Sequence, residues 1–310
     1  NTDATSNTAV GSGSMDANTT GAYNTAIGTD SLTENTTGDF NVALGRAAMQ
    51  NNNADGNTAI GRNAMYANTT GVRNLAIGHQ AYDASDTEND NIAIGYGAMT
   101  ENTAGGTKNI ALGNYSLDAL TSGDENVAMG YAALGANTSA NYNTALGSNC
   151  LKVNTTGTSN TGVGAYCLYD NVEGISLTAV GVNALENNTT GNYSTSMGSS
   201  ALAANTTGHG NTSIGYQALN GNTTGDSNTA VGQQANKVTE TGINCTMIGS
   251  LSRSSGVDVN NEVVLGSNDM VGKGAGTAFI SGGGGPVYAG NNATVFETTS
   301  DRRIKKDIIP

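Results

Sequence analysis

The chain has 310 residues, and its 44 Gly, 42 Asn and 41 Thr together fill about two fifths of them. It has no Trp, three Phe and two Pro, and only 36% of it is hydrophobic, which argues against a single large globular core. The net charge of −13, with 12 Lys and Arg against 25 Asp and Glu, argues against nucleic acid as a partner, because phosphate binding depends on basic side chains. No apolar run approaches the ~18 residues of a membrane span. Because the chain opens at Asn1 rather than Met, we expect a fragment or a processed product, so the lack of a signal peptide says nothing of its destination.

One motif repeats along most of the chain. An aliphatic residue followed by Gly recurs sixteen times between residue 7 and about residue 270, in a unit of the form Asn-Thr-Ala-Ile-Gly-x-x-Ala-Leu-x-x-Asn-Thr-Thr-Gly-x-x. The intervals are 17 residues, apart from one of 16 and one of 18. The repeated glycines are Gly11, Gly28, Gly45, Gly61, Gly78, Gly95, Gly113, Gly130, Gly147, Gly164, Gly181, Gly198, Gly215, Gly232, Gly249 and Gly266. A fixed short period of this kind predicts a stack of identical structural units.

Each column of the repeat predicts an environment. The aliphatic column, directly before the Gly, holds Val, Ile, Leu or Met in every repeat, and we expect it to be buried. The Leu/Met column, four residues after the Gly, predicts a second inward-facing row. The Ala column, two residues before the Gly, should face away from the aliphatic column, because side chains alternate along a strand. Its small size indicates close approach of another backbone.

The repeat predicts an all-β protein, a parallel β-solenoid or β-roll of about sixteen coils over residues 1–271. Seventeen residues cannot hold two helices, and the recurrent Gly would destabilise a helix. Two extended segments of four or five residues per coil fit instead, each pairing with its equivalent one repeat away. The Asn seven residues after the Gly would then stack into a hydrogen-bonded ladder, from Asn18 to Asn222. Ordering the backbone costs ~1–2 kcal/mol per residue, and about four buried side chains per coil offset this cost poorly for 17 residues. We therefore expect the chain to associate with other chains.

The repeat resembles those of two families. Asn-x-Ala-Ile-Gly-x-x-Ala is similar to the head repeats of trimeric autotransporter adhesins, which form trimeric left-handed parallel β-rolls. The fuller Asn-Thr-Ala-Ile-Gly and Asn-Thr-Thr-Gly pattern resembles more closely the repeats of bacteriophage tail fibres. The resemblance implies a homotrimeric structural and adhesive fibre, a tail-fibre shaft or receptor-binding appendage of a virion, whose partner is a host surface receptor such as a polysaccharide. The alternative is a bacterial cell-surface trimeric adhesin or another extracellular fibre.

The period fails after Gly266. Residues 272–299, rich in Gly, predict a connector of short strands. Residues 300–310 resemble the opening of the self-cleaving intramolecular chaperones of phage tail spikes and fibres, although an exposed basic tail would look alike. The resemblance implies that Ser300 is the nucleophile, Lys305 its general base and Ser300–Asp301 the scissile bond, with Lys305 active only if its pKa is lowered. Such cleavage happens once, so the chain is not expected to be a turnover enzyme.

Candidate metal ligands are few, and we expect neither a cofactor nor a metal. An acidic run could bind Ca²⁺ through carboxylate oxygens, but a solvated variant loop is the simpler interpretation. His79 and His209 each stand alone. The run consists of Asp83, Asp86, Glu88 and Asp90.

Cysteines and tyrosines offer two further hypotheses. Cys150 and Cys167 share a column in successive repeats, so a disulfide is possible by distance, although small buried thiols are the default for these two and Cys245. Tyr96, Tyr131 and Tyr216 all follow the repeated Gly and could stack on sugar rings, or be scattered surface residues.

Two other functions compete with a fibre. An ice-binding solenoid needs a flat exposed file of Thr, and Thr occupies ten of the sixteen positions three before the Gly, interrupted by Val, Leu and Ile. A polysaccharide-degrading tail spike needs paired Asp or Glu side chains in a groove, and no two repeats present such a pair clearly.

Overall fold

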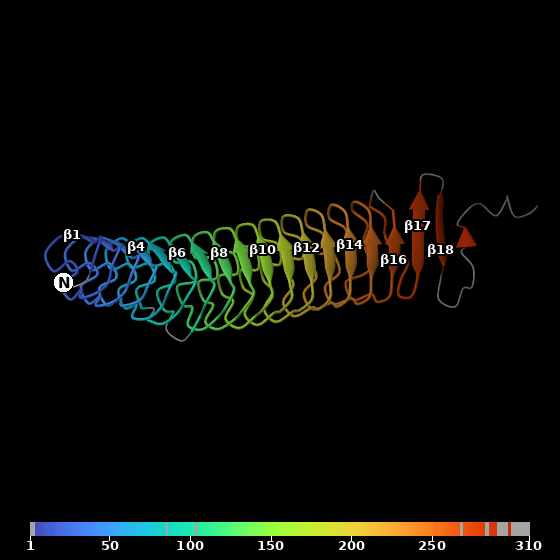
Figure 1. Cartoon of the computed structure of the whole chain (residues 1–310). Helices are drawn as coiled ribbons and strands as arrows, with labels where there is room; N and C mark the ends of the chain where they lie inside the picture. The colour runs from blue at the N-terminus through green and yellow to red at the C-terminus, as the bar shows by residue number, and fades with distance from the viewer. Residues whose placement is uncertain are drawn as a thin grey trace, which may run out of the picture. The chain divides into compact units, whose positions relative to one another are not determined.

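The computed structural model describes residues 4–84, 86–102, 105–266, 269–282, 285–289 and 297–298. These residues form a parallel β-solenoid of about sixteen coils of roughly 17 residues, and they include no helix, which confirms the predicted all-β coil (Figure 1). The chain divides into two compact units, Asn1–Glu173 and Gly174–Pro310.

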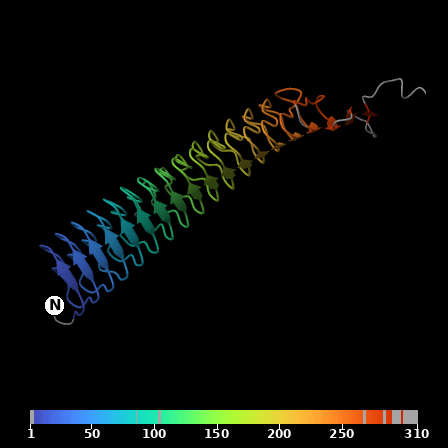
Figure 2. The same ribbon diagram turned by 90° about the horizontal axis from the view of Figure 1, so that it is seen from above.

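Among its described residues, the first unit contains ten strands of three residues each. Each described pair of consecutive strands is parallel and in register, so that Thr8 lies beside Thr25 and Val10 beside Ile27. The arrows form one row along the side of this unit (Figure 2). The strands are β1 (Thr8–Val10), β2 (Thr25–Ile27), β3 (Val42–Leu44), β4 (Thr58–Ile60), β5 (Leu75–Ile77), β6 (Ile92–Ile94), β7 (Ile110–Leu112), β8 (Val127–Met129), β9 (Thr144–Leu146) and β10 (Thr161–Val163).

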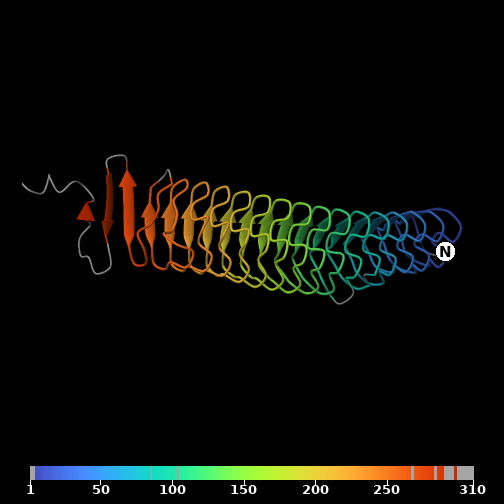
Figure 3. The same cartoon turned by 180° about the vertical axis from the view of Figure 1, so that it is seen from behind.

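The second unit repeats this parallel row and then changes direction. After the row of parallel strands the pairing direction changes. Strand β17 still pairs parallel with β16, but β18 runs antiparallel to β17, and β19 antiparallel to β18 (Figure 3). The described residues of segment 272–299, for which short strands were predicted, thus include strands of five, five and two residues. The strands are β11 (Thr178–Val180), β12 (Thr195–Met197), β13 (Thr212–Ile214), β14 (Thr229–Val231), β15 (Thr246–Ile248), β16 (Val263–Leu265), β17 (Ala278–Gly282), β18 (Gly285–Ala289) and β19 (Glu297–Thr298).

Each described coil has one strand, so the expectation of two extended segments per coil was wrong. After the strand, the backbone enters the left-handed region at alternate residues, with φ of 140° at Gly28, 56° at Asp30 and 50° at Leu32. A strand cannot follow that path. The turns still bond from coil to coil, because the N–H of Leu32 donates to the carbonyl oxygen of Ala48 at 3.0 Å.

Glycine at the end of the strand is required by two constraints. Its φ near 140° is strained for any residue with a Cβ, and a Cβ on Gly28 would collide with the carbonyl oxygen of Gly45 in the next coil. The coils therefore stack closely only with Gly at this position.

The inward and outward sides of the strand are the reverse of those expected. In β2 and β3 the Ala column is fully buried at Ala26 and Ala43, whereas the aliphatic column is 39% exposed at Ile27 and 43% at Leu44. The interior of a coil holds two small residues and the buried Leu/Met column, and it is too narrow for a further branched side chain. The aliphatic column therefore faces outward, and the small residues fill the interior rather than meeting a second chain.

Two columns of buried Asn line the coils. The expected ladder is confirmed at several steps, since Nδ2 of Asn205 donates to Oδ1 of Asn188 at 2.8 Å, and Nδ2 of Asn222 to Oδ1 of Asn205 at 2.9 Å. A second column, four residues before the repeated Gly, was not expected to be structural. Its Oδ1 accepts the backbone N–H of the next coil, as from Asn41 to Asn24 at 2.9 Å. Both corners of the coil are thus hydrogen-bonded through side chains.

The second unit ends in a wider core. The Ala column changes to Met247, Val264 and Phe279 in successive strands, and these pack with Cys245 and Met270. The interior of the last coils is therefore filled by larger side chains than that of the coils before them.

Candidate functional site

The outer face of the strands is an uncharged surface, called here the sheet face. It consists of the aliphatic column and the residues three before the Gly, which point the same way because side chains alternate along a strand. In β1 to β16 these positions hold only Thr, Val, Leu, Ile and Met. The most exposed members of the aliphatic column are Val10, Ile27, Leu44, Leu112 and Met129 in the first unit, and Val180, Met197, Ile214 and Ile248 in the second. A contiguous exposed apolar face is a candidate interaction surface.

A file of aromatic rings occupies the turns after β5 to β8 in the first unit. The ring centroids of His79 and Tyr96 lie 5.2 Å apart, those of Tyr96 and Tyr115 5.3 Å, and those of Tyr115 and Tyr131 6.0 Å. Two of the three tyrosines expected on the surface, Tyr96 and Tyr131, belong to this file, whereas Tyr216 lies in the second unit. Tyr115 was not expected, because it is the second rather than the first residue after its Gly.

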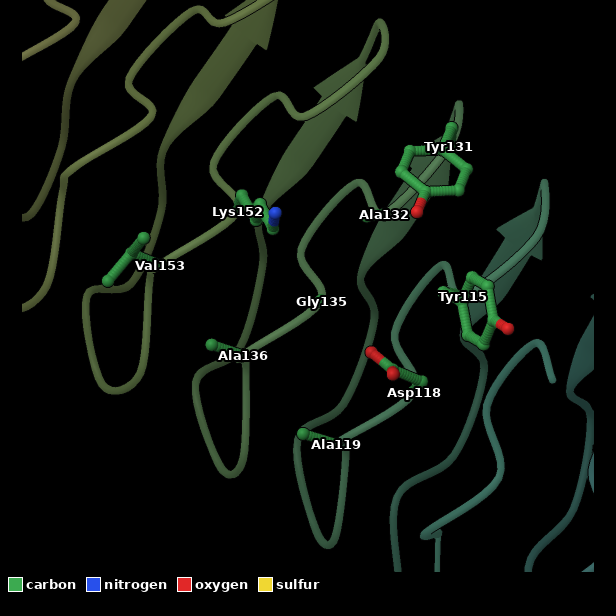
Figure 4. Close-up of a pocket in the computed structure, with 9 residues that line it drawn as sticks. All are labelled: Tyr115, Asp118, Ala119, Tyr131, Ala132, Gly135, Ala136, Lys152 and Val153. Atoms are coloured by element: carbon green, nitrogen blue, oxygen red, sulfur yellow. The ribbon is translucent and has the colours of Figure 1, made fainter.

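A groove of about 610 Å³ lies beside the last two of these rings (Figure 4). Small residues line much of it, and Asp118 and Lys152 contribute its charges. A smaller hollow of about 260 Å³ shares Tyr115 and Asp118 and adds Tyr96, Asp83 and Glu101. The groove residues are Tyr115, Asp118, Ala119, Tyr131, Ala132, Gly135, Ala136, Lys152 and Val153.

The carboxylates of this region influence one another. Partial burial raises the pKa of Asp118, and the nearby charge of Glu101 adds to the rise while Lys152 opposes it. Burial also raises the pKa of Asp83, where a hydrogen bond from Gln80 acts in the opposite direction and Glu101 again raises it. The coils therefore bring three carboxylates to one side of the first unit, although they come from different repeats and form no obvious pair in the sequence.

The acidic run predicted as a weak Ca²⁺ candidate is divided among separate roles. Oε2 of Glu88 accepts the backbone N–H groups of Asp86 and Thr87, both at 3.1 Å, within its own turn. Asp90 forms a bidentate pair with Arg73 at 2.6 and 2.9 Å, and Asp83 faces the smaller hollow. Across the part of the chain that the structure describes, no three His, Cys, Asp or Glu side chains gather as a metal site.

The histidines take part in local contacts. His79 stacks on Tyr96, and Nδ1 of His209 accepts the backbone N–H of Asn192 at 3.0 Å. The predicted self-cleavage residues Ser300, Asp301 and Lys305 lie outside the described residues.

All three cysteines are buried, and none is in a disulfide. The pKa of Cys150 is raised by a hydrogen bond with Cys167 and by burial, so this thiol stays protonated. The interpretation as small buried thiols is confirmed.

Comparisons with known proteins yield no relative, since no family model, no curated protein and no solved structure matches the chain. A search of the described residues also found no helix long and apolar enough to cross a membrane.

Proposed function

We propose that the chain is a structural and adhesive fibre that assembles as a parallel homotrimer through its sheet face. The observation that carries the proposal is the outward-facing aliphatic column, which presents uncharged, partly exposed Val, Ile, Leu and Met side chains in coil after coil. A long side chain of this type contributes ~1.5–3 kcal/mol when it is fully removed from water. Association would add to the small stabilisation that a core of Ala and Leu can supply.

The number of chains and the biological setting rest on resemblance. The repeats are similar to those of bacteriophage tail fibres and of trimeric autotransporter heads, so we propose a tail-fibre shaft or receptor-binding appendage of a virion. A bacterial cell-surface adhesin or another extracellular fibre is the alternative. Flanking capsid or baseplate genes would favour the virion, and flanking secretion genes the cell surface.

A single self-cleavage belongs to the same proposal. In a precursor that continues beyond residue 310, the resemblance implies that the Ser300 hydroxyl attacks the carbonyl carbon of the Ser300–Asp301 bond while Lys305 takes its proton. The proton passes to the nitrogen of Asp301, which leaves as a free amine, and water hydrolyses the ester that remains. Intact-mass measurement of protein made with the downstream residues would then find a chain ending at Ser300. A Ser300→Ala chain that is cut at the same place would contradict this part.

The oligomeric state tests the sheet face directly. Light scattering should give the wild type three times the mass of one chain. The double variant Leu44→Asp with Leu112→Asp places two carboxylates on this face of the first unit and should reduce the mass, while circular dichroism keeps its β-sheet signal. Tyr142→Asp adds a charge at another exposed position and should leave the mass unchanged. A wild type that is monomeric at micromolar concentration would refute the proposal.

Ice binding is favoured by one observation in the second unit. Thr178, Thr195, Thr212, Thr229 and Thr246 occupy one outward position in five successive strands, β11 to β15. An ice-recrystallisation assay would test it, and activity that disappears in Thr212→Lys would support ice binding over self-association.

A further inference from the structure

We propose that the groove beside Tyr115 and Tyr131 binds a neutral oligosaccharide, which runs along the coils with its sugar rings against the tyrosines. This proposal deepens the adhesive function and rests on it for its biological purpose. It assigns the receptor contact to the side of the first unit rather than to a tip.

The tyrosine rings beside the groove meet edge to face rather than face to face. Tyr96 and Tyr115 meet at an interplanar angle of 74°, and Tyr115 and Tyr131 at 85°. An edge-to-face pair leaves a ring face uncovered, whereas Tyr23 and Phe40, with planes 2° apart, cover each other's inner faces. As whole residues, Tyr115 and Tyr131 are 39% and 52% exposed. Large aromatic surface with a polar tip suits a ligand that is apolar on one side and wet on the other.

The spacing of the rings favours a linear saccharide. Consecutive coils of a parallel sheet repeat every ~4.8 Å, and the ring centroids from Tyr96 to Tyr131 follow this repeat at 5.3 and 6.0 Å. One pyranose unit of an extended glycan has a similar length. Because the planes of Tyr115 and Tyr131 stand 85° apart, one sugar of such a chain lies against the face of one ring and the next sugar meets the other ring at its edge.

The groove has the polar groups that orient a sugar. Asp118 supplies acceptor oxygens for hydroxyl groups, and Lys152 supplies a donor on the opposite side (Figure 4). The Lys152 ammonium lies 5.7 Å from the ring centroid of Tyr169, which restricts its position. Gly135 leaves the space beside the Asp118 carboxylate free, because a Cβ at residue 135 would lie only 3.3 Å from Oδ1 of Asp118.

The charged side chains in and beside the groove disfavour anionic and cationic ligands. The carboxylates of Asp83, Glu101 and Asp118 outnumber the single Lys152, so phosphate groups and other polyanions would be repelled. A cationic ligand would meet Lys152 inside the groove itself. A neutral, hydroxyl-rich ligand satisfies both charged side chains.

Calorimetry and saturation-transfer NMR with cellotetraose, chitotetraose and maltotetraose test the proposal. At least one of these probes should bind the wild type, with saturation transferred to sugar C–H protons. Tyr115→Ala and Tyr131→Ala should each weaken that binding about tenfold, as loss of a central aromatic contact commonly does. Gly135→Leu should abolish it by filling the groove while both rings remain.

A matched control comes from Tyr142, which is 59% exposed but does not line the groove. Tyr142→Ala should bind as the wild type does. If none of the three probes binds, or if Tyr142→Ala loses as much affinity as Tyr115→Ala, the proposal is refuted. Light scattering of the same samples separates the two proposals. A monomer that binds sugar would refute the trimer and support the groove as a sugar site. A trimer that binds no sugar would support the trimer and refute the sugar site.

Discussion

The side-chain oxygen of Asn24 accepts the backbone N–H of Asn41, one coil later, at 2.9 Å. Oδ1 of Asn41 accepts the N–H of Asn57 in the same way, also at 2.9 Å. The amide of Asn24 also donates through Nδ2 to the carbonyl oxygen of Gly38 at 2.7 Å. Asn is suited to this corner because one short side chain satisfies a buried donor and a buried acceptor together.

Asn24→Ala should therefore destabilise the first unit strongly. The substitution leaves the buried N–H of Asn41 without its partner, which costs about 1–3 kcal/mol, while the carbonyl oxygen of Gly38 keeps its hydrogen bond from Nδ2 of Asn35 at 3.0 Å. Chemical denaturation should show a lower midpoint. Asn51→Ala, in a half-buried turn position outside this column, serves as the control and should change the midpoint little. Equal effects of the two substitutions would show that the column contributes nothing special.

The period of the repeat predicted the coil and its stacking, but not which side of the strand is inside. Ala43 and Leu44 alternate, so the sequence shows that they face opposite sides. Both are apolar, and hydrophobicity alone favoured the larger one for the core. The width of the interior decides otherwise: the Leu/Met column already fills the space, and only Ala, Ser or Gly fits opposite it in most coils.

Substitutions at these two neighbours should separate folding from association. Ala43→Leu adds three carbon atoms to a fully buried position and should lower the stability by about 1–3 kcal/mol or more through overpacking. Leu44→Asp lies on the sheet face and should preserve the fold of the single chain. Denaturation curves and light scattering, measured on both variants, check this. A Leu44→Asp chain that fails to fold would show that the aliphatic column belongs to the core.

The groove was only partly predictable, for a related reason. The sequence identified Tyr96 and Tyr131 as exposed, but Tyr115 comes from a different column and joins them because the rings lean toward one another between coils. Asp118 and Lys152 lie more than thirty residues apart and meet across the groove only once the coils are stacked. Side-chain direction at a turn with left-handed residues is not encoded in a simple periodicity.

Gly162 replaces the usual Ala of its column, and the neighbouring cysteines explain it. A Cβ on Gly162 would lie 2.6 Å from Sγ of Cys150 and 3.7 Å from Sγ of Cys167. Gly162→Ala should therefore destabilise the chain by ~1–3 kcal/mol through overpacking. The double variant Cys150→Ala with Gly162→Ala restores the usual pair of Ala residues and should recover most of the loss. A double-mutant cycle measures this coupling, and strictly additive effects would contradict it.

Asp118→Asn should stabilise the first unit near neutral pH and have little effect in acid. Burial raises the pKa of Asp118 in the folded chain, so its ionised form is disfavoured there relative to the unfolded chain. The stability that protonation gives is fully present below the ordinary pKa of an Asp and is lost as the pH rises through the raised value. An amide at this position carries no charge at any pH, so the melting temperature of the variant should exceed that of the wild type at pH 7, and the difference should narrow as the pH falls. Glu101 and Lys152 also face Asp118, but both are common to the two proteins, so the difference between them isolates this one group. Asp16→Asn, at an exposed position, should leave the melting temperature nearly unchanged at both pH values. A variant less stable than the wild type at pH 7 would instead mean that the ionised carboxylate of Asp118 stabilises the fold through its contacts with backbone N–H groups and Lys152.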